Sequence, residues 1–303
     1  MGFINSINLA LTKNASNSNV VTYNVMRSIK CVFDKFKIKY HYYVENDFIV
    51  IYQQGRVAST SIYESLKLLK LSEPVWHVHY ISNESNDNLI KEAYLHNKKA
   101  YRHLFVGKLL AKLIKHNSKA IKFKIITVLR DPVSVILSTL FINGGRNFSH
   151  LLNRQEGFTN ADVSACIENM FIKDNIEGWS ILKWFEEVME IEIGVDIFTH
   201  EMDRDAGFNI VNDKEFELLL IKFERLNDSY PLAIETFLGV DKKSVTLEHK
   251  NLHRNDQFSE SQKYAKENLK LPREVCERIY SSRYITHFYN VQEIEHMISK
   301  WSK

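Results

Sequence analysis

Cysteine, proline and glycine are scarce in this chain of 303 residues, which holds 3, 4 and 10 of them respectively. Three widely spaced cysteines, an odd number, fit neither a disulfide framework nor a cysteine-based metal cluster, and they indicate free thiols in a reducing compartment. The shortage of proline and glycine argues against long linkers, low-complexity segments and all-β architectures with many turns. No run of about 18 apolar residues occurs, so no transmembrane helix is expected.

Charge is also nearly balanced. The formal net charge is +3, so composition gives no reason to expect a nucleic acid or a membrane as partner, although a local basic cleft for an anionic ligand stays open. The first 18 residues contain a short apolar patch without a basic lead-in or a small-residue cleavage site. We therefore predict no signal peptide and a cytoplasmic location.

Short apolar, β-branched runs alternate with helical patterns along the chain. The runs predict strands at residues 47–52, 75–81, 121–129, 195–199 and 216–223. Helices are predicted at 20–37, 62–70, 89–116, 132–141, 162–191, 229–238 and within 257–303, with a loop at 144–160. This alternation predicts an α/β fold with a mostly parallel central sheet flanked by helices. We expect one domain over residues 1–303, with a nucleotide-binding core at about 47–142 and acceptor-side helices and a late strand at about 143–303.

A loop of mostly small residues separates the first predicted strand from the next helix. Its residues are Gly55, Arg56, Val57, Ala58, Ser59, Thr60 and Ser61. Backbone N–H groups, the helix dipole, three hydroxyls and one guanidinium at such a turn predict a cradle for a tetrahedral oxyanion such as phosphate. The alternative is a Ser or Thr N-cap with nothing bound. The loop lacks the second glycine and the lysine of a Walker A motif, which disfavours ATP or GTP hydrolysis.

A second anion-binding element is predicted where the strand at 121–129 ends. Arg130 follows that strand, at the edge where ligands bind in open α/β sheets, and Ser138 lies two turns along the following helix. A guanidinium fork with a hydroxyl suits a second phosphate. The alternative is a surface pair between Arg130 and Asp131 with a solvent-facing serine.

Taken in order, the two elements resemble those of sulfotransferases that use 3′-phosphoadenosine 5′-phosphosulfate (PAPS). Residues 55–61 resemble the 5′-phosphosulfate loop, and Arg130-Asp131-Pro132 followed by Ser138 resembles the 3′-phosphate element. The resemblance covers residues 47–142 and points to carbohydrate O-sulfotransferases of the 2-O kind and to a bacterial family linked to capsular polysaccharide synthesis. Residues 216–226 and 284–289 resemble later parts of these proteins. The resemblance implies a P-loop-type sulfotransferase fold, PAPS as co-substrate, PAP as product, a glycan acceptor and no metal.

Two histidines, His77 and His79, are candidates for the catalytic base. They are two residues apart on a predicted strand and therefore share a face, and a His-x-His pair at a similar place is associated with the base in the 2-O branch. We favour His77 as base and His79 as orienter, with Glu64 and His103 as substitutes and a structural or metal-binding pair as alternatives. Arg56, where many sulfotransferases have lysine, is expected to stabilise charge on the leaving group, because arginine does not donate a proton.

The acceptor is less defined. Trp76, Tyr80, Trp179 and Trp184 are candidates for stacking on sugar rings or for the core, and basic loop positions are candidates for contacting an anionic ligand: Arg146, His150, Arg154, Lys250, His253 and Arg254. Two other function classes stay open at this point. One is a phosphate-loop kinase, which the missing lysine disfavours, and the other is a non-catalytic nucleotide-binding protein of a polysaccharide pathway.

Overall fold

The computed structural model describes residues 20–96, 98, 101–142, 163–165, 167–168, 181–248 and 259–303. The chain divides into two compact units. The first unit comprises Met1–Gln53, Lys70–Ile125 and Asn212–Glu217, and the second comprises Gln54–Leu69, Ile126–Val211 and Leu218–Lys303. The predicted single domain over residues 1–303 stays a prediction.

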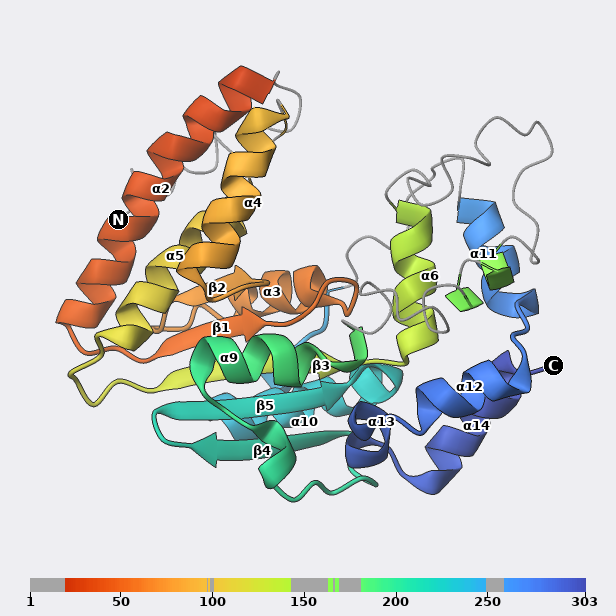
Figure 1. Cartoon of the computed structure of the whole chain (residues 1–303). Coiled ribbons are helices and arrows are strands. Elements are labelled where there is room, and N and C mark those ends of the chain that lie inside the picture. The colour runs from red at the N-terminus through yellow and green to blue at the C-terminus, as the bar shows by residue number, and fades with distance from the viewer. Residues whose placement is uncertain are drawn as a thin grey trace. The chain divides into compact units, whose positions relative to one another are not determined.

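A five-stranded, mostly parallel sheet has the strand order β2-β1-β3-β5-β4 (Figure 1). Its strands are β1 Phe48–Tyr52, β2 Val75–Val78, β3 Phe123–Leu129, β4 Phe208–Asp213 and β5 Phe216–Lys222. β1 and β2 pair in parallel, with Tyr52 opposite Val78. β4 and β5 are neighbours joined by only two residues, which makes that pair an antiparallel hairpin. The α/β prediction is confirmed at this level.

The three inner strands explain the continuous apolar runs. Every residue of β1 is buried, and so are six of the seven residues in β3 and in β5. A strand covered on both faces has few positions for polar side chains, so its sequence consists mostly of valine, isoleucine, leucine and phenylalanine. This is why these strands were predictable from the sequence.

In the first unit, helices α2 Val20–Tyr43 and α4 Asn83–Leu95 both pack against α5 Arg102–Lys115 (Figure 1). Ser82 caps α4, since its Oγ accepts a hydrogen bond from Ser85 N at 3.1 Å. Gly107 on α5 allows a close approach, because a Cβ at this position would lie 2.1 Å from the carbonyl oxygen of Tyr80. The predicted helices at 20–37 and 89–116 are confirmed, the first with a longer C-terminal end and the second as two helices.

The described part of the second unit is mainly helical. Its α-helices are α3 Ser59–Leu68, α6 Pro132–Ile142, α9 Glu190–Ile193, α10 Leu226–Leu238, α11 Ser259–Asn268, α12 Arg273–Tyr280, α13 Arg283–Phe288 and α14 Val291–Trp301. The described part also contains one π-helix, η2 Phe185–Met189, and three short 3₁₀ helices, η3 Ile197–Thr199, η4 Phe223–Arg225 and η5 Lys242–Ser244. An aromatic cluster of Phe185, Phe198, Tyr284 and Phe288 packs η2, η3 and α13 together. The predicted start of α6 at Pro132 is confirmed.

The predicted strand at 195–199 is wrong, because residues 197–199 form the 3₁₀ helix η3. Asp196 explains the difference: its side chain accepts a hydrogen bond from Phe198 N at 3.0 Å and closes a turn in competition with an extended backbone. The edge strand β4 was not predicted. The predicted loop at 144–160 lies outside the described residues, as do residues 162, 166 and 169–180 of the predicted helix at 162–191. Among the helices of the described residues, none combines the length and the apolar character needed to span a bilayer.

Candidate functional site

The predicted oxyanion loop at residues 55–61 is separated from β1 by two residues, and its last three residues form the first turn of α3. Val57 anchors the loop, since its side chain is fully buried, whereas Gly55 is exposed. A Cβ built on Gly55 would have no neighbour within 4 Å. The fold of the loop therefore tolerates a side chain at this position, and a need for glycine there would come from a ligand that approaches the backbone.

Two non-glycine residues of the loop have a left-handed backbone conformation, Arg56 with φ 73° and Ala58 with φ 65°. This conformation costs about 1–2 kcal/mol for a residue with a Cβ, and such strain concentrates at functional sites. Ala58 occupies the N-cap position of α3 and supplies no side-chain cap. The alternative of a Ser or Thr N-cap is thereby excluded, and the positive end of α3 is not capped by the side chain of its N-cap residue.

The three hydroxyl residues of the loop have different surroundings. Ser59 and Ser61 are buried, and Thr60 is exposed. The carbonyl oxygen of Ser61 accepts a hydrogen bond from the hydroxyl of Ser65, which holds the first turn of α3. Thr60 is thus the most exposed of the three residues.

Arg130 contacts the loop directly. Its Nη1 donates a hydrogen bond to the carbonyl oxygen of Arg56 at 2.5 Å, and its guanidinium lies 3.9 Å from the centre of the Phe223 ring. Its Nε is buried and has no hydrogen-bond partner among the described residues. Burial lowers the pKa of Arg130, and the carboxylates of Glu224 and Asp131 oppose that shift. The two elements predicted from the sequence are therefore brought together in the second unit.

The backbone of Arg130 is held by Tyr284 on α13. The Tyr284 hydroxyl accepts a hydrogen bond from Arg130 N at 2.9 Å and donates one to Arg130 O at 3.1 Å. Burial raises the pKa of this hydroxyl, so it keeps its proton. The segment 284–289 thus fixes the strand end from which the arginine extends.

Asp131 is buried, which excludes the predicted alternative of an Arg130–Asp131 surface pair. Its carboxylate accepts hydrogen bonds from Tyr280 Oη at 2.7 Å, Trp301 Nε1 at 2.8 Å and Ser134 Oγ at 2.7 Å. Its own N–H donates to Glu224 Oε1 at 2.8 Å, and burial raises the pKa of Glu224. Asp131 therefore links the end of β3 to the C-terminal helices.

Ser138 lies on α6 and is half-buried. A basic residue that the sequence analysis missed, Lys266, belongs to α11, which packs against α6. Partial burial and the positive charges of Arg130 and Lys300 lower the pKa of Lys266. The only signal for this lysine in the sequence is its position in the helical pattern of residues 259–268. That it acts on Arg130 could not be predicted without the tertiary structure.

The first unit contains a cluster of three histidine rings. The rings of His77 and His79 have centroids 5.0 Å apart, and the ring of His103 lies 4.8 Å from that of His79. His79 Nδ1 is 2.8 Å from the carbonyl oxygen of Gln53. Because a carbonyl oxygen only accepts hydrogen bonds, Nδ1 carries the proton, and in the neutral ring the lone pair is on Nε2. Gln53 precedes Gly55 by two residues in the chain.

Burial and the positive charges of His79 and Arg102 lower the pKa of His77 to about 3. Burial and the charges of His79, His77 and Arg27 lower the pKa of His103 to about 3 as well. Both rings are therefore neutral at pH 7. Within the described residues, no group of three or more His, Cys, Asp or Glu side chains is arranged to hold a metal ion.

The other candidates are placed as follows. Glu64 forms an ion pair with Lys67 at 2.9 Å on α3. Trp76 and Trp184 are buried and belong to the core rather than to a sugar-stacking surface, and Tyr80 is half-buried. The remaining predicted acceptor contacts lie outside the described residues: Arg146, His150, Arg154, Trp179, Lys250, His253 and Arg254.

Comparison with known proteins gives one family match. Residues 159–290 match a family model described as “Putative capsular polysaccharide synthesis protein”. The matched segment includes residues 284–289, whose resemblance to a bacterial capsule family was predicted from the sequence. This match supports a role in a capsular polysaccharide pathway. No curated protein and no solved structure matches the chain.

Proposed function

We propose that this protein transfers a sulfuryl group from PAPS to a hydroxyl of a carbohydrate, in a cell-surface or capsular glycan, and releases PAP. The observation that carries the proposal is the hydrogen bond from Arg130 to the carbonyl oxygen of Arg56. It joins the two predicted anion-binding elements, at residues that are 74 positions apart in the chain. A ligand with two separate phosphate groups, such as a 3′,5′-bisphosphorylated nucleoside, suits such a pair better than a single phosphate does.

In this proposal the two ends of PAPS have different partners. The 5′-phosphosulfate binds the loop at residues 55–61, where the N-terminus of α3 and the guanidinium of Arg56 favour negative charge. The 3′-phosphate binds Arg130 and Ser138, and Lys266 adds positive charge beside Arg130.

The reaction forms one bond and breaks one. The acceptor oxygen attacks sulfur, the bond from sulfur to the bridging phosphate oxygen breaks, and its electron pair leaves with PAP. Arg56 stabilises the charge that develops on the leaving group, and a histidine takes the proton of the acceptor hydroxyl.

We assign the base to His79 rather than to His77, which the sequence had favoured. A ring with a pKa of about 3, as in His77, accepts a proton poorly near neutral pH. His79 is oriented by its hydrogen bond to Gln53 and has its lone pair on Nε2. A positive charge on His79 contributes, after burial, to the lowered pKa of His77 and of His103.

The first experiment measures thermal stabilisation of the full chain by PAP, with ATP and AMP as comparison ligands. PAP at about 100 times its Kd should raise the free energy of unfolding by about 2.7 kcal/mol. Arg130→Ala should abolish this response, whereas Arg273→Ala, which removes an exposed arginine of α12, should keep it. A wild-type protein that does not respond to millimolar PAP overturns the proposal.

A second experiment separates binding from catalysis. His79→Ala should keep the PAP response and lose transfer from labelled PAPS to a glycan panel, with His116→Ala as a control outside the cluster. If His79→Ala keeps full turnover, the base assignment is wrong. If the wild-type protein binds PAP but transfers to no glycan of the panel, a non-catalytic nucleotide-binding role replaces transfer.

A further inference from the structure

Helix α2 carries an exposed apolar stripe along its length. Large apolar side chains recur every three or four residues and are 46–79% exposed: Val25, Ile29, Val32, Phe36, Tyr40 and Tyr43. At 1.5 Å per residue the stripe is about 27 Å long. The opposite side of the same helix is packed, since Tyr23, Asp34 and Ile38 are buried. The helix is thus apolar on a largely exposed face as well as on its packed face.

The exposed charged side chains that α2 and α5 carry are all basic. Lys35 and Lys39 on α2 and Lys112 and Lys115 on α5 are exposed, and none of these four forms an ion pair with another described residue. The only acidic residue of either helix is Asp34, which is buried and neutralised by two hydrogen bonds from Arg102, at 2.7 and 2.6 Å. The α2–α5 face therefore combines apolar and cationic groups.

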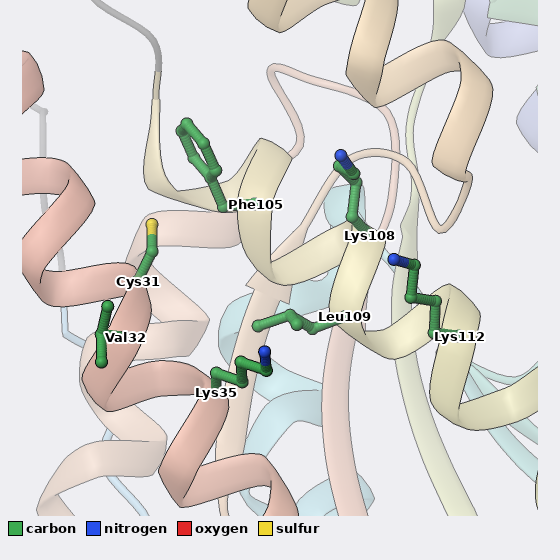
Figure 2. Close-up of a pocket in the computed structure, with 7 residues that line it drawn as sticks. All are labelled: Cys31, Val32, Lys35, Phe105, Lys108, Leu109 and Lys112. Carbon is green, nitrogen blue, oxygen red and sulfur yellow. The ribbon is translucent and has the colours of Figure 1, made fainter.

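A groove lies between the two helices and is continuous with the stripe through Val32. Its volume is about 270 Å³. Figure 2 shows the seven lining side chains, of which four are apolar or weakly polar and three are lysines: Cys31, Val32, Phe105, Leu109, Lys35, Lys108 and Lys112. Lys108 pairs with Asp87, so the groove has lysines on both helices and no carboxylate among its lining residues.

We propose that the α2–α5 face docks on an anionic membrane surface. An amphipathic helix with lysines beside an apolar stripe is the arrangement that lies in the plane of a bilayer interface, and Tyr40 and Tyr43 are of the residue type enriched at that depth. The lysine ammonium groups reach anionic headgroups while the stripe enters the acyl boundary.

The positive charge of the α2–α5 face favours an anionic membrane over two other possible occupants. A second copy of the chain would place lysines against lysines. The segment of residues 1–19 contains one lysine and no acidic residue, so it too has the wrong sign for this face. An anionic lipid surface complements both the charge and the apolar stripe.

The test measures co-sedimentation of the full chain with vesicles of phosphatidylcholine alone and of equimolar phosphatidylcholine and phosphatidylglycerol. We expect binding to the anionic vesicles only, decreasing with salt. Each lysine near an anionic surface contributes about fivefold, so the triple variant Lys35→Ser, Lys39→Ser, Lys112→Ser should bind on the order of 100-fold more weakly. A matched triple variant in the second unit, Lys242→Ser, Lys243→Ser, Lys263→Ser, should bind as the wild type does.

The apolar contribution is tested by Phe36→Ser, with Ile191→Ser as the control, because both side chains are exposed. Phe36→Ser should weaken binding by about tenfold, and Ile191→Ser should not. The thermal unfolding midpoint of each variant verifies that it is folded. Absence of binding to anionic vesicles, or an equal loss in both lysine variants, overturns the proposal. Sedimentation velocity that shows a dimer broken by Phe36→Ser would overturn it in favour of a second copy.

Discussion

Removing the carboxylate of Asp131 should destabilise the protein strongly, because this buried group accepts hydrogen bonds from three side chains and one backbone N–H. In Asp131→Ala, the Tyr280 hydroxyl and the Trp301 indole lose their partner in buried surroundings, at about 1–3 kcal/mol each. Loss of the bond to Val133 N at the start of α6 adds about 1 kcal/mol. We expect a total loss of about 4 kcal/mol, a large part of the 5–15 kcal/mol typical of a folded protein.

The assay is urea unfolding followed by far-ultraviolet circular dichroism, since one variant changes a tryptophan. Asp131→Asn keeps an acceptor for Tyr280 and Val133, but its amide cannot accept from Trp301 Nε1. Trp301→Phe should therefore cost less in the Asp131→Asn background than in the wild type, with a coupling free energy of about 1–2 kcal/mol. Strict additivity of the two changes, or a loss below about 1 kcal/mol in Asp131→Ala, would refute the reasoning.

Three further predictions concern other residues. Gly107→Ala should lower the free energy of unfolding by about 2–3 kcal/mol, because its Cβ would lie 2.1 Å from the Tyr80 carbonyl oxygen, and a urea midpoint equal to that of the wild type would contradict this. Ala58→Gly should raise the free energy of unfolding by about 1 kcal/mol by relieving the left-handed backbone, and unfolding in urea measures it. The pKa values of His77 and His103 are lowered from 6.5 to about 3. Between pH 6.5 and about 3 the unfolded chain therefore binds more protons than the folded chain, so the free energy of unfolding falls as the pH decreases through this range. The slope is at most ~1.4 kcal/mol per pH unit for each ring, and His103→Asn should flatten it; an unchanged slope would count against the pKa values.

The sheet could be predicted where burial on both faces left a clear signal in the sequence. β1 is an unbroken apolar run, β3 and β5 are mostly apolar, and Pro132 marks the start of α6. The edge strand β4, Phe208–Asp213, has only one buried residue, so its sequence lacks such a run. At 195–199 the apolar composition was misleading, because a single capping aspartate, Asp196, closed a turn instead.

The sequence predicted which residues form the candidate site, but it could not predict the backbone conformations and contacts that hold them in place. The loop and Arg130 stand at strand ends, which the pattern of runs reveals. The left-handed conformations of Arg56 and Ala58 could not be predicted from the sequence, because neither residue is the glycine that usually marks such a position. Two partners of the Asp131 carboxylate, Tyr280 and Trp301, are 149 and 170 residues away, and contacts of that separation leave no trace in local periodicity.

The neighbours Arg130 and Asp131 have different roles, which relate the two predicted phosphate-binding elements to the family match. Both elements lie outside the matched residues 159–290, whereas the residues that fix their strand end lie inside it. Tyr284 holds the Arg130 backbone, Glu224 receives the Asp131 N–H, and Tyr280 binds the Asp131 carboxylate. The Arg130 side chain is thus left to reach the loop, while its backbone is fixed by the matched segment. A change at Tyr284 should consequently impair nucleotide binding without touching the nucleotide, which would make the matched segment the positioning half of the proposed site.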